Sequence, residues 1–359
     1  MLYHFLYPLS QSVSAFNIFR YITFRAIVAF LIAAAISIIW GKAFINFMKL
    51  KQFGQVIRDD GPESHLKKAG TPTMGGVFIL GSILFALFFC GNFLSAPFLV
   101  TMFVLSSYFA LGFLDDYLIV LRGNTDGVSA KGKLVWQILT ALAASWYLYY
   151  QGVIDTQFYV PFVKGPLFDM GGIGYVLFST LVIVGSSNAV NLTDGLDGLA
   201  IGPIITSSVT LALLAYVSGH REISSYLFIP YIDGVGELSV LATAIIGAGV
   251  GFLWYNSYPA QIFMGDVGSL SLGGTLGTIA VITKNEILFV LIGGVFVVEA
   301  LSVILQVASF KLRGKRIFKM APIHHHFELL GWPEPKVIVR FWIISIFLAL
   351  VAIATLKMR

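Results

Sequence analysis

The chain has few charged residues and almost no cysteine. Charged residues make up 11% of its 359 residues, whereas a soluble globular domain carries roughly 25%. Cys90 is the single cysteine, so an intrachain disulfide and a cysteine-cluster metal site are excluded. We expect Cys90 to be a small, buried helix residue. No cleavable signal peptide is expected either, because the first residues lack a basic start.

Long apolar segments take the place of charge. Hydrophobic residues make up 57% of the sequence, and a run of about 20 apolar residues spans a bilayer as a helix. We therefore expect an all-α, polytopic integral membrane protein that forms a single domain over residues 1–359. Ten transmembrane helices are predicted, at Ile22–Phe47, Gly75–Phe93, Ala96–Leu114, Leu134–Tyr150, Ile173–Val190, Leu199–Val217, Leu238–Asn256, Val267–Thr283, Ile287–Phe310 and Val337–Leu356.

The distribution of basic residues predicts the orientation of these helices. An even number of spans puts both termini on one side of the membrane. The loops after the first, third and ninth spans hold 14 Lys and Arg residues, against 7 on the other side. Because cytoplasmic loops carry the excess of Lys and Arg, the termini are expected outside the cytoplasm. The polar motifs then face the cytoplasm, and the outer loops look chemically bland.

Two adjacent acids, Asp115 and Asp116, stand where the third span is predicted to end. Neighbouring residues on a helix point about 100° apart, so one partner cannot serve both equally and different roles are expected. A pair of interfacial acids that face water is the alternative interpretation.

A second polar group interrupts two apolar segments, in "NLTDGLDG". Asn191, Asp194 and Asp197 are spaced by three residues, which would place them on one face if the stretch is helical. The glycines at 195 and 198 favour a turn with exposed backbone amides instead. Asp197 is alternatively the N-cap of the helix that follows.

Two further polar motifs lie before the eighth span and after the ninth. Asp266 precedes a predicted helix, so an N-cap role is its simplest interpretation, and Phe263 could offer a flat face to a base. In "MAPIHHHFE" three adjacent histidines cannot easily converge on one zinc ion. Donation to phosphate oxygens is the favoured interpretation, and solvated loop histidines are the alternative.

Taken together, these motifs indicate a reaction at a phosphate. Carboxylates without cysteines suit Mg²⁺, which prefers oxygen ligands and substrate phosphates. Basic residues and histidines suit the phosphates themselves. A site of this kind at the membrane predicts phosphoryl transfer to a lipid.

The same motifs carry a resemblance to a known family. "GTPTMGG", "LDDY", "NAVNLTDGLDGLA", "PAQIFMGDVGS" and "MAPIHHHFE" resemble motifs of the polyprenyl-phosphate N-acetylhexosamine-1-phosphate transferase superfamily, and the first and last are more specific to its muramoyl-pentapeptide branch. The resemblance runs from about Phe16 to the C-terminus. It implies that UDP-MurNAc-pentapeptide gives its phospho-sugar to undecaprenyl phosphate in the bacterial inner membrane, forming lipid I and UMP. It also implies Mg²⁺ dependence, ten helices with periplasmic termini, a cytoplasmic active-site cleft and a homodimer.

The resemblance also implies roles for individual residues. Asp266 is similar to the family's Mg²⁺ ligand, and Asp115 and Asp116 to the acidic pair tied to catalysis and to the lipid phosphate. His324 is similar to a catalytic residue of the cytoplasmic cleft. Substrate-binding roles are implied for Lys68, Thr73, Lys133, Asn191, Asp194, Gly195, Leu196, Asp197, Phe263, Gln306 and His325.

Three points stay open at this level. A sister transferase that uses UDP-GlcNAc is the nearest alternative, and a secondary transporter with a cytoplasmic anion site is the alternative of another class. Transporter sites usually lie near the membrane midplane, whereas these acids cluster at helix ends. In the ninth span, Gly293 and Gly294 can mark a bend. Glu299 in the same span is either functional or an interhelical hydrogen-bonding group.

Overall fold

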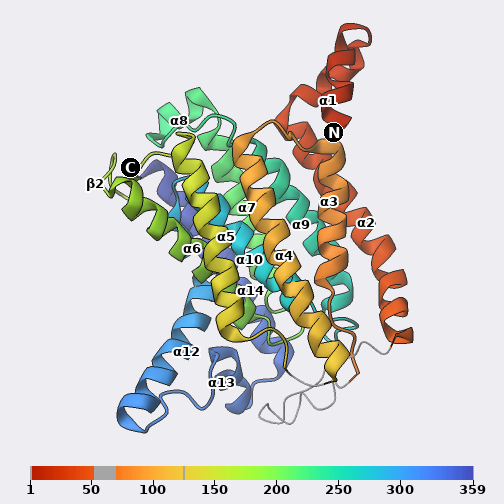
Figure 1. Ribbon diagram of the computed structural model, residues 1–359, viewed down its shortest axis with the longest axis vertical. Coiled ribbons are helices and arrows are strands. Elements are labelled where there is room, and N and C mark those ends of the chain that lie inside the picture. Colours follow the sequence, from red (N-terminus) through yellow and green to blue (C-terminus); the bar gives the residue numbers. More distant parts are fainter. Residues whose placement is uncertain (1, 52–69, 124–125, 359) are drawn as a thin grey trace.

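The fold is a bundle of long helices (Figure 1). The computed structural model describes residues 2–51, 70–123 and 126–358. Figure 1 places both termini at one end of the bundle and α12 and α13 at the other.

A helix occupies each of the ten predicted segments, and the ninth is divided at Gly293 into α11 and α12. The helices are α2 (Ile22–Leu50), α3 (Gly76–Cys90), α4 (Ala96–Arg122), α5 (Ala130–Tyr150), α6 (Gly171–Thr193), α7 (Ile201–Ser218), α9 (Glu237–Asn256), α10 (Gly265–Ile282), α11 (Glu286–Ile292), α12 (Gly294–Arg313) and α14 (Glu334–Ala354). Within the described residues, eight of these, all except α3, α5 and α11, are long and apolar enough to cross a membrane. The chain is therefore a polytopic, mostly helical membrane protein.

Short helices and one pair of strands lie at the two ends of the bundle. They are α1 (Leu2–Leu6), the 3-10 helices η1 (Pro8–Gln11), η2 (Ser14–Arg20) and η4 (Thr355–Lys357), the antiparallel strands β1 (Gln157–Phe158) and β2 (Phe168–Asp169), α8 (Arg221–Leu227) and α13 (Ile323–Leu329).

The most enclosed helix is α10, and its glycines allow that enclosure. Nearly all of its span is buried, 89%, between α6, α4 and α3. A Cβ at Gly76 of α3 would overlap the backbone of Gly268, and one at Gly112 of α4 would overlap the backbone of Asp266. Small residues at helix crossings let backbones approach closely in membranes. The start of α10 is therefore set tightly against α4.

The prediction that the third span ends at Leu114 was wrong. The helix α4 continues to Arg122, and Gly123 ends it in the left-handed conformation with φ 62°, which glycine adopts without strain. Residues 117–121 are again aromatic or aliphatic, so the two acids interrupt the apolar stretch without ending the helix. Asp115 and Asp116 consequently lie within α4 and not at its end.

The end of the bundle that holds the termini contains buried ion pairs that the sequence analysis did not predict. At the end of the bundle that holds the termini, Arg25 of α2 forms a two-point ion pair with Glu237 of α9, at 2.6 and 2.8 Å. Arg25 is 1% exposed and Glu237 7%. Nearby in the fold, Lys284 pairs with Asp155 at 3.2 Å and is itself buried. Both pairs join residues far apart in sequence, which is why loop composition did not reveal them.

The Arg25–Glu237 pair gives a stability prediction. In a Glu237→Gln variant the buried guanidinium loses its counter-charge, and uncompensated buried charges destabilise by about 3 kcal/mol or more. We expect a clearly lower melting temperature in detergent, measured by intrinsic fluorescence. The double variant Arg25→Met with Glu237→Leu should recover most of the loss, and Glu222→Gln on exposed α8 should lose nothing. An unchanged melting temperature in Glu237→Gln would contradict this account.

Candidate active site

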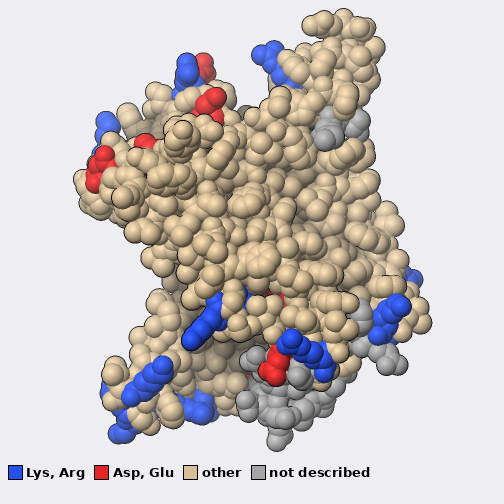
Figure 2. All heavy atoms as spheres, viewed as in Figure 1, with Lys and Arg blue, Asp and Glu red and all other residues tan. Residues whose placement is uncertain are grey.

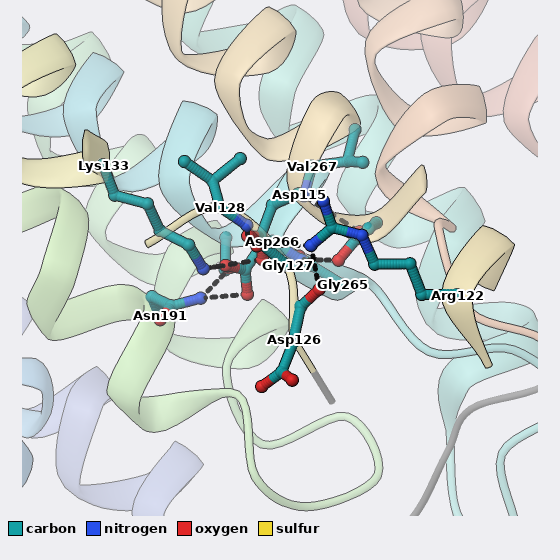
Figure 3. A network of polar contacts seen from close by, with 12 residues as sticks. Asp115, Arg122, Asp126, Gly127, Val128, Lys133, Asn191, Gly265, Asp266 and Val267 are labelled. Atoms are coloured by element: carbon teal, nitrogen blue, oxygen red, sulfur yellow. Dashed lines mark hydrogen bonds and ion pairs between the residues drawn. The ribbon is translucent and has the colours of Figure 1, made fainter. Parts of the chain in front are cut away.

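Three carboxylates from two helices meet at one point (Figure 3). Asp115 and Asp116 come from α4, and Asp266 comes from the first turn of α10. One carboxylate oxygen from each lies within 4.8 Å of the others. The acids that the sequence analysis assigned to a single phosphate site therefore lie together.

Asp116 serves the start of α10. Its two oxygens accept hydrogen bonds from the backbone N–H groups of Asp266 and Val267, each at 3.2 Å. Gly265 precedes them with φ +73°, and a Cβ there would overlap the carboxylate of Asp116. A negative charge at a helix N-terminus also interacts favourably with the helix dipole. The N-cap interpretation of Asp266 was wrong, because α10 begins at Gly265 after Met264.

Asp115 turns in another direction, toward α5. It accepts hydrogen bonds from the Val128 backbone N–H at 2.6 Å and from the Lys133 ammonium at 2.6 Å. The same ammonium lies 2.7 Å from Asp266. The two adjacent acids thus have different partners, as their spacing on a helix predicts, and Lys133 supplies the positive charge between Asp115 and Asp266.

The segment after α6 forms a turn, as its glycines favoured. Asn191, in the last turn of α6, donates to Asp266 at 2.7 Å and to Ser269 at 2.9 Å. Asp197 instead accepts from the Ala260 backbone N–H at 2.9 Å. It is not an N-cap, because α7 begins at Ile201 with Ala200 as the capping residue. The turn therefore ties the loop before α10 to the end of α6.

Asp194 is partly buried in that turn and sits among like charges. Enclosure by the protein raises its pKa to about 7, and the nearby carboxylates of Asp266 and Asp197 add to the shift. The backbone N–H of Gly265 acts in the opposite direction. Asp194 consequently takes up a proton near neutral pH.

The "GTPTMGG" segment holds the other side of the same loop. The Phe263 backbone N–H donates to Pro72, while Gly75 and Gly76 donate to Phe263 and Met264, all at 2.8 Å. Thr73 is buried beside Gly265, whereas the ring of Phe263 remains partly exposed. The loop that positions Asp266 is thus fixed from both sides.

The three adjacent histidines all lie in α13, and each has a different partner. His324 lies 3.1 Å from Glu299, and His325 lies 2.8 Å from Glu328. His326 accepts a hydrogen bond from the Lys319 backbone N–H at 3.1 Å. They do not converge on one point, which agrees with the argument against a zinc site.

Two of the predicted binding residues, Leu196 and Gln306, have structural contacts and do not border the acid cluster. Leu196 is buried in an apolar cluster with Val295 and Phe341. Gln306 on α12 uses its amide to hold the backbone of Phe318, at 2.9 and 3.0 Å. Lys68 lies outside the described residues.

Sequence reasoning missed several groups that complete the site. They include the backbone N–H groups of Val128 and Ala260, and Glu334, which accepts from the Asp197 N–H at 3.0 Å. Backbone donors have no sequence signature. Glu334 carries only the weak signal of an acid in the first turn of α14.

The donor set fits a hard divalent cation. Three carboxylates with one ammonium among them leave an excess of negative charge, and their ligand atoms are all oxygens, which Mg²⁺ prefers. The Lys133 ammonium already occupies a cation position between two of them. Asp115, Asp116 and Asp266 are therefore the residues that could hold such an ion.

Comparison with known proteins gives first the class and then the family. The Glycosyl transferase family 4 model matches residues 98–284, just over half of the chain. The phospho-N-acetylmuramoyl-pentapeptide-transferase signature 1 matches residues 68–80. Proteins named phospho-N-acetylmuramoyl-pentapeptide-transferase from Geobacter sp. (strain M21), Citrifermentans bemidjiense and Pelobacter propionicus are each 56% identical over the full length of both chains. The chain belongs to the phospho-N-acetylmuramoyl-pentapeptide-transferase family.

The raised pKa of Asp194 gives a pH prediction. Between about pH 4 and pH 7 the folded state binds a proton that the unfolded state has lost, so this group makes the protein less stable as pH rises through that window. Asn cannot titrate. We expect the melting temperature of Asp194→Asn in detergent to match wild type at about pH 4 and to exceed it increasingly up to about pH 8. The exposed Asp233→Asn serves as control, and parallel pH curves for wild type and Asp194→Asn would refute the prediction.

Proposed function

We propose that this protein transfers phospho-MurNAc-pentapeptide from UDP-MurNAc-pentapeptide to undecaprenyl phosphate, forming lipid I and UMP. The full-length relatives carry the name of this activity. The observation that carries the proposal is the meeting of Asp115, Asp116, Asp266 and Lys133 at one site. Carboxylates for a metal ion beside a cation for phosphate are what a transfer between two phosphorylated substrates requires.

The charge pattern of the surface supports anionic substrates. Figure 2 shows Lys and Arg side chains around a recess at the end of the molecule that holds α12 and α13. The acid cluster lies at the same end of the bundle. A recess lined by positive charge raises the local concentration of anions such as a nucleotide sugar.

The finer topology is part of the proposal. Ten spans, with α11 and α12 together as the ninth, put both termini in the periplasm and the cleft in the cytoplasm. The Lys and Arg count along the loops supports this orientation. We also propose one transferase domain over residues 1–359, operating as a homodimer in the inner membrane.

The transfer joins two anions, and the chain's own residues reduce their repulsion. An acceptor phosphate oxygen forms a bond to the β-phosphorus of the nucleotide sugar, and the bond from that phosphorus to UMP breaks. Lys133 and His324 are proposed as donors where charge develops. Mg²⁺, held by Asp266 with Asp115 and Asp116 beside it, supplies charge neutralisation at the pyrophosphate when bound.

The remaining roles concern the nucleotide sugar. Thr73, Asn191, Asp194, Gly195, Leu196, Asp197, Phe263, Gln306, His325 and Lys68 are proposed to form its binding cleft. The partly exposed ring of Phe263 supports stacking on uracil. Leu196 and Gln306 would contribute by shaping the cleft, since one is packed in the core and the other holds the loop before α13.

Asp115 is proposed to organise the site and not to abstract a proton. A phosphate monoester has a second pKa near 6, so the acceptor is mostly dianionic at pH 7. Both oxygens of Asp115 are also engaged, by the Val128 N–H and by Lys133. Its carboxylate therefore fixes the loop before α5 and the position of the ammonium.

The reaction itself is tested by UMP release. Purified protein in detergent, given UDP-MurNAc-pentapeptide and undecaprenyl phosphate, is expected to release UMP only with Mg²⁺, because the pyrophosphate charge needs neutralisation. A chelator should abolish release and added Mg²⁺ should restore it. Turnover of UDP-GlcNAc instead would indicate the sister transferase. Absence of UMP release without vesicles, together with transport in vesicles, would indicate a transporter.

The role of Asp115 is tested by turnover against pH. We expect Asp115→Asn to lose about 100-fold or more in kcat, as catalytic-site electrostatic changes do, and to stay equally low from pH 6.5 to 9. Its amide keeps an acceptor for Val128 but cannot neutralise Lys133. Recovery toward the wild-type rate above pH 8, where the acceptor is fully ionised, would show instead that the carboxylate acts as a base.

A further inference from the structure

Glu299 and His324 are enclosed together between α12 and α13. Both residues are 0% exposed. Oε2 of Glu299 lies 3.1 Å from Nδ1 of His324. The contact is an ion pair by distance and not an aligned hydrogen bond, and neither side chain has a hydrogen-bond partner among the described residues. Among the described residues, this contact is the one ion pair that either side chain makes.

Removal of either member of this pair would leave the other buried without a partner, which would destabilise the fold. A carboxylate buried without a partner costs several kcal/mol, since the interior does not replace its hydration. Glu299 comes from the ninth span, while His324 belongs to a separate short helix far along the chain. The contact is thus a tertiary one, and it fixes the ring against α12.

The other ring nitrogen points at the turn after α6. Nε2 of His324 lies so close to Gly195 that a Cβ at this glycine would overlap it. Gly195 neighbours Asp194, whose carboxylate interacts with Asp266. One nitrogen of the ring therefore faces Glu299, and the opposite one faces the loop that borders the acid cluster.

We propose that Glu299 is a positioning residue for His324, a role that rests on the proposed function. Its carboxylate keeps a proton on Nδ1 and directs Nε2 to the turn at 194–200, which is part of the proposed nucleotide-sugar cleft. The partner of one ring nitrogen decides what the other can do. With Nδ1 turned to Glu299, Nε2 is the ring nitrogen that faces this turn.

The neighbouring histidines give a contrast. Glu328, the partner of His325, lies three residues away on the same helix. His326 accepts a backbone hydrogen bond at Nδ1, so its neutral ring carries the proton on Nε2. Of the three, His324 contacts an acid from a different helix, Glu299 of α12, and its second nitrogen lies against the turn that is proposed to bind the nucleotide sugar.

The test measures the protonation of the ring separately from turnover. Full-length protein with ¹⁵N-labelled histidine rings is compared as wild type, Glu299→Gln and Glu299→Asp by NMR, with His324→Gln to assign the signal. Glu328→Gln is the matched control, because it removes an acid from the adjacent histidine. Kinetics of UMP release use Glu222→Gln as the surface control, and melting temperatures report folding.

The proposal expects the Nδ1 of wild-type His324 to be protonated, and Glu299→Gln to shift that signal while Glu328→Gln leaves it in place. It also expects kcat of Glu299→Gln to fall about 10- to 100-fold, the range for lost supporting partners, with little change in KM, and Glu299→Asp to recover part of it. An unprotonated Nδ1 of His324 in the wild type would overturn the proposal. A kcat equal to wild type in a folded Glu299→Gln variant would also overturn it. If the wild type releases no UMP, the proposed function fails. The NMR comparison still decides whether Glu299 determines which nitrogen of the His324 ring carries a proton.

Discussion

Three carboxylates in one small volume repel one another, and the site depends on how that repulsion is offset. Asp116 directs its charge to the amide groups that begin α10. Asp115 and Asp266 share the ammonium of Lys133, and Asn191 adds a hydrogen bond to Asp266. The acids and the groups that offset their charge come from α4, α5, α6 and α10, so the acids can be held together only when those four helices are packed. The acid cluster therefore forms only in the folded helix bundle.

Glycines make that packing possible. Gly112, Gly127 and Gly265 each leave a space that a Cβ would close, and each space borders Asp115, Asp116 or the backbone of Asp266. A methyl group at any of them would push an acid away from its partner. Glycine at these positions therefore allows the helices and loops to pack closely around the carboxylates.

Sequence patterns predicted the helices and the acids that lie together in the fold, but not how those acids are held. Hydrophobic runs set the spans because the bilayer imposes their length. The residue types at 115, 116, 191 and 266 indicated a metal and phosphate site because few other uses justify acids beside spanning helices. The end of α4 and the start of α7 were misjudged, because an acid can lie inside a helix, as Asp115 does, or in the turn before one, as Asp197 does. The amides of Val128 and Ala260, the pairing of Glu299 with His324 and the ion pairs at the far end all arise from tertiary contacts that no local pattern encodes.

The attachment of the histidine segment to α12 has a mechanical consequence. Glu299 near the start of this helix contacts His324, and Gln306 further along holds the backbone of Phe318. The helix stands away from the bundle beyond the break at Gly293 (Figure 1). A spanning helix tilts to match the thickness of the hydrocarbon layer, and here the tilting element would carry the histidines with it. The thickness of the surrounding lipid would thereby affect the position of the histidine segment beside the turn after α6.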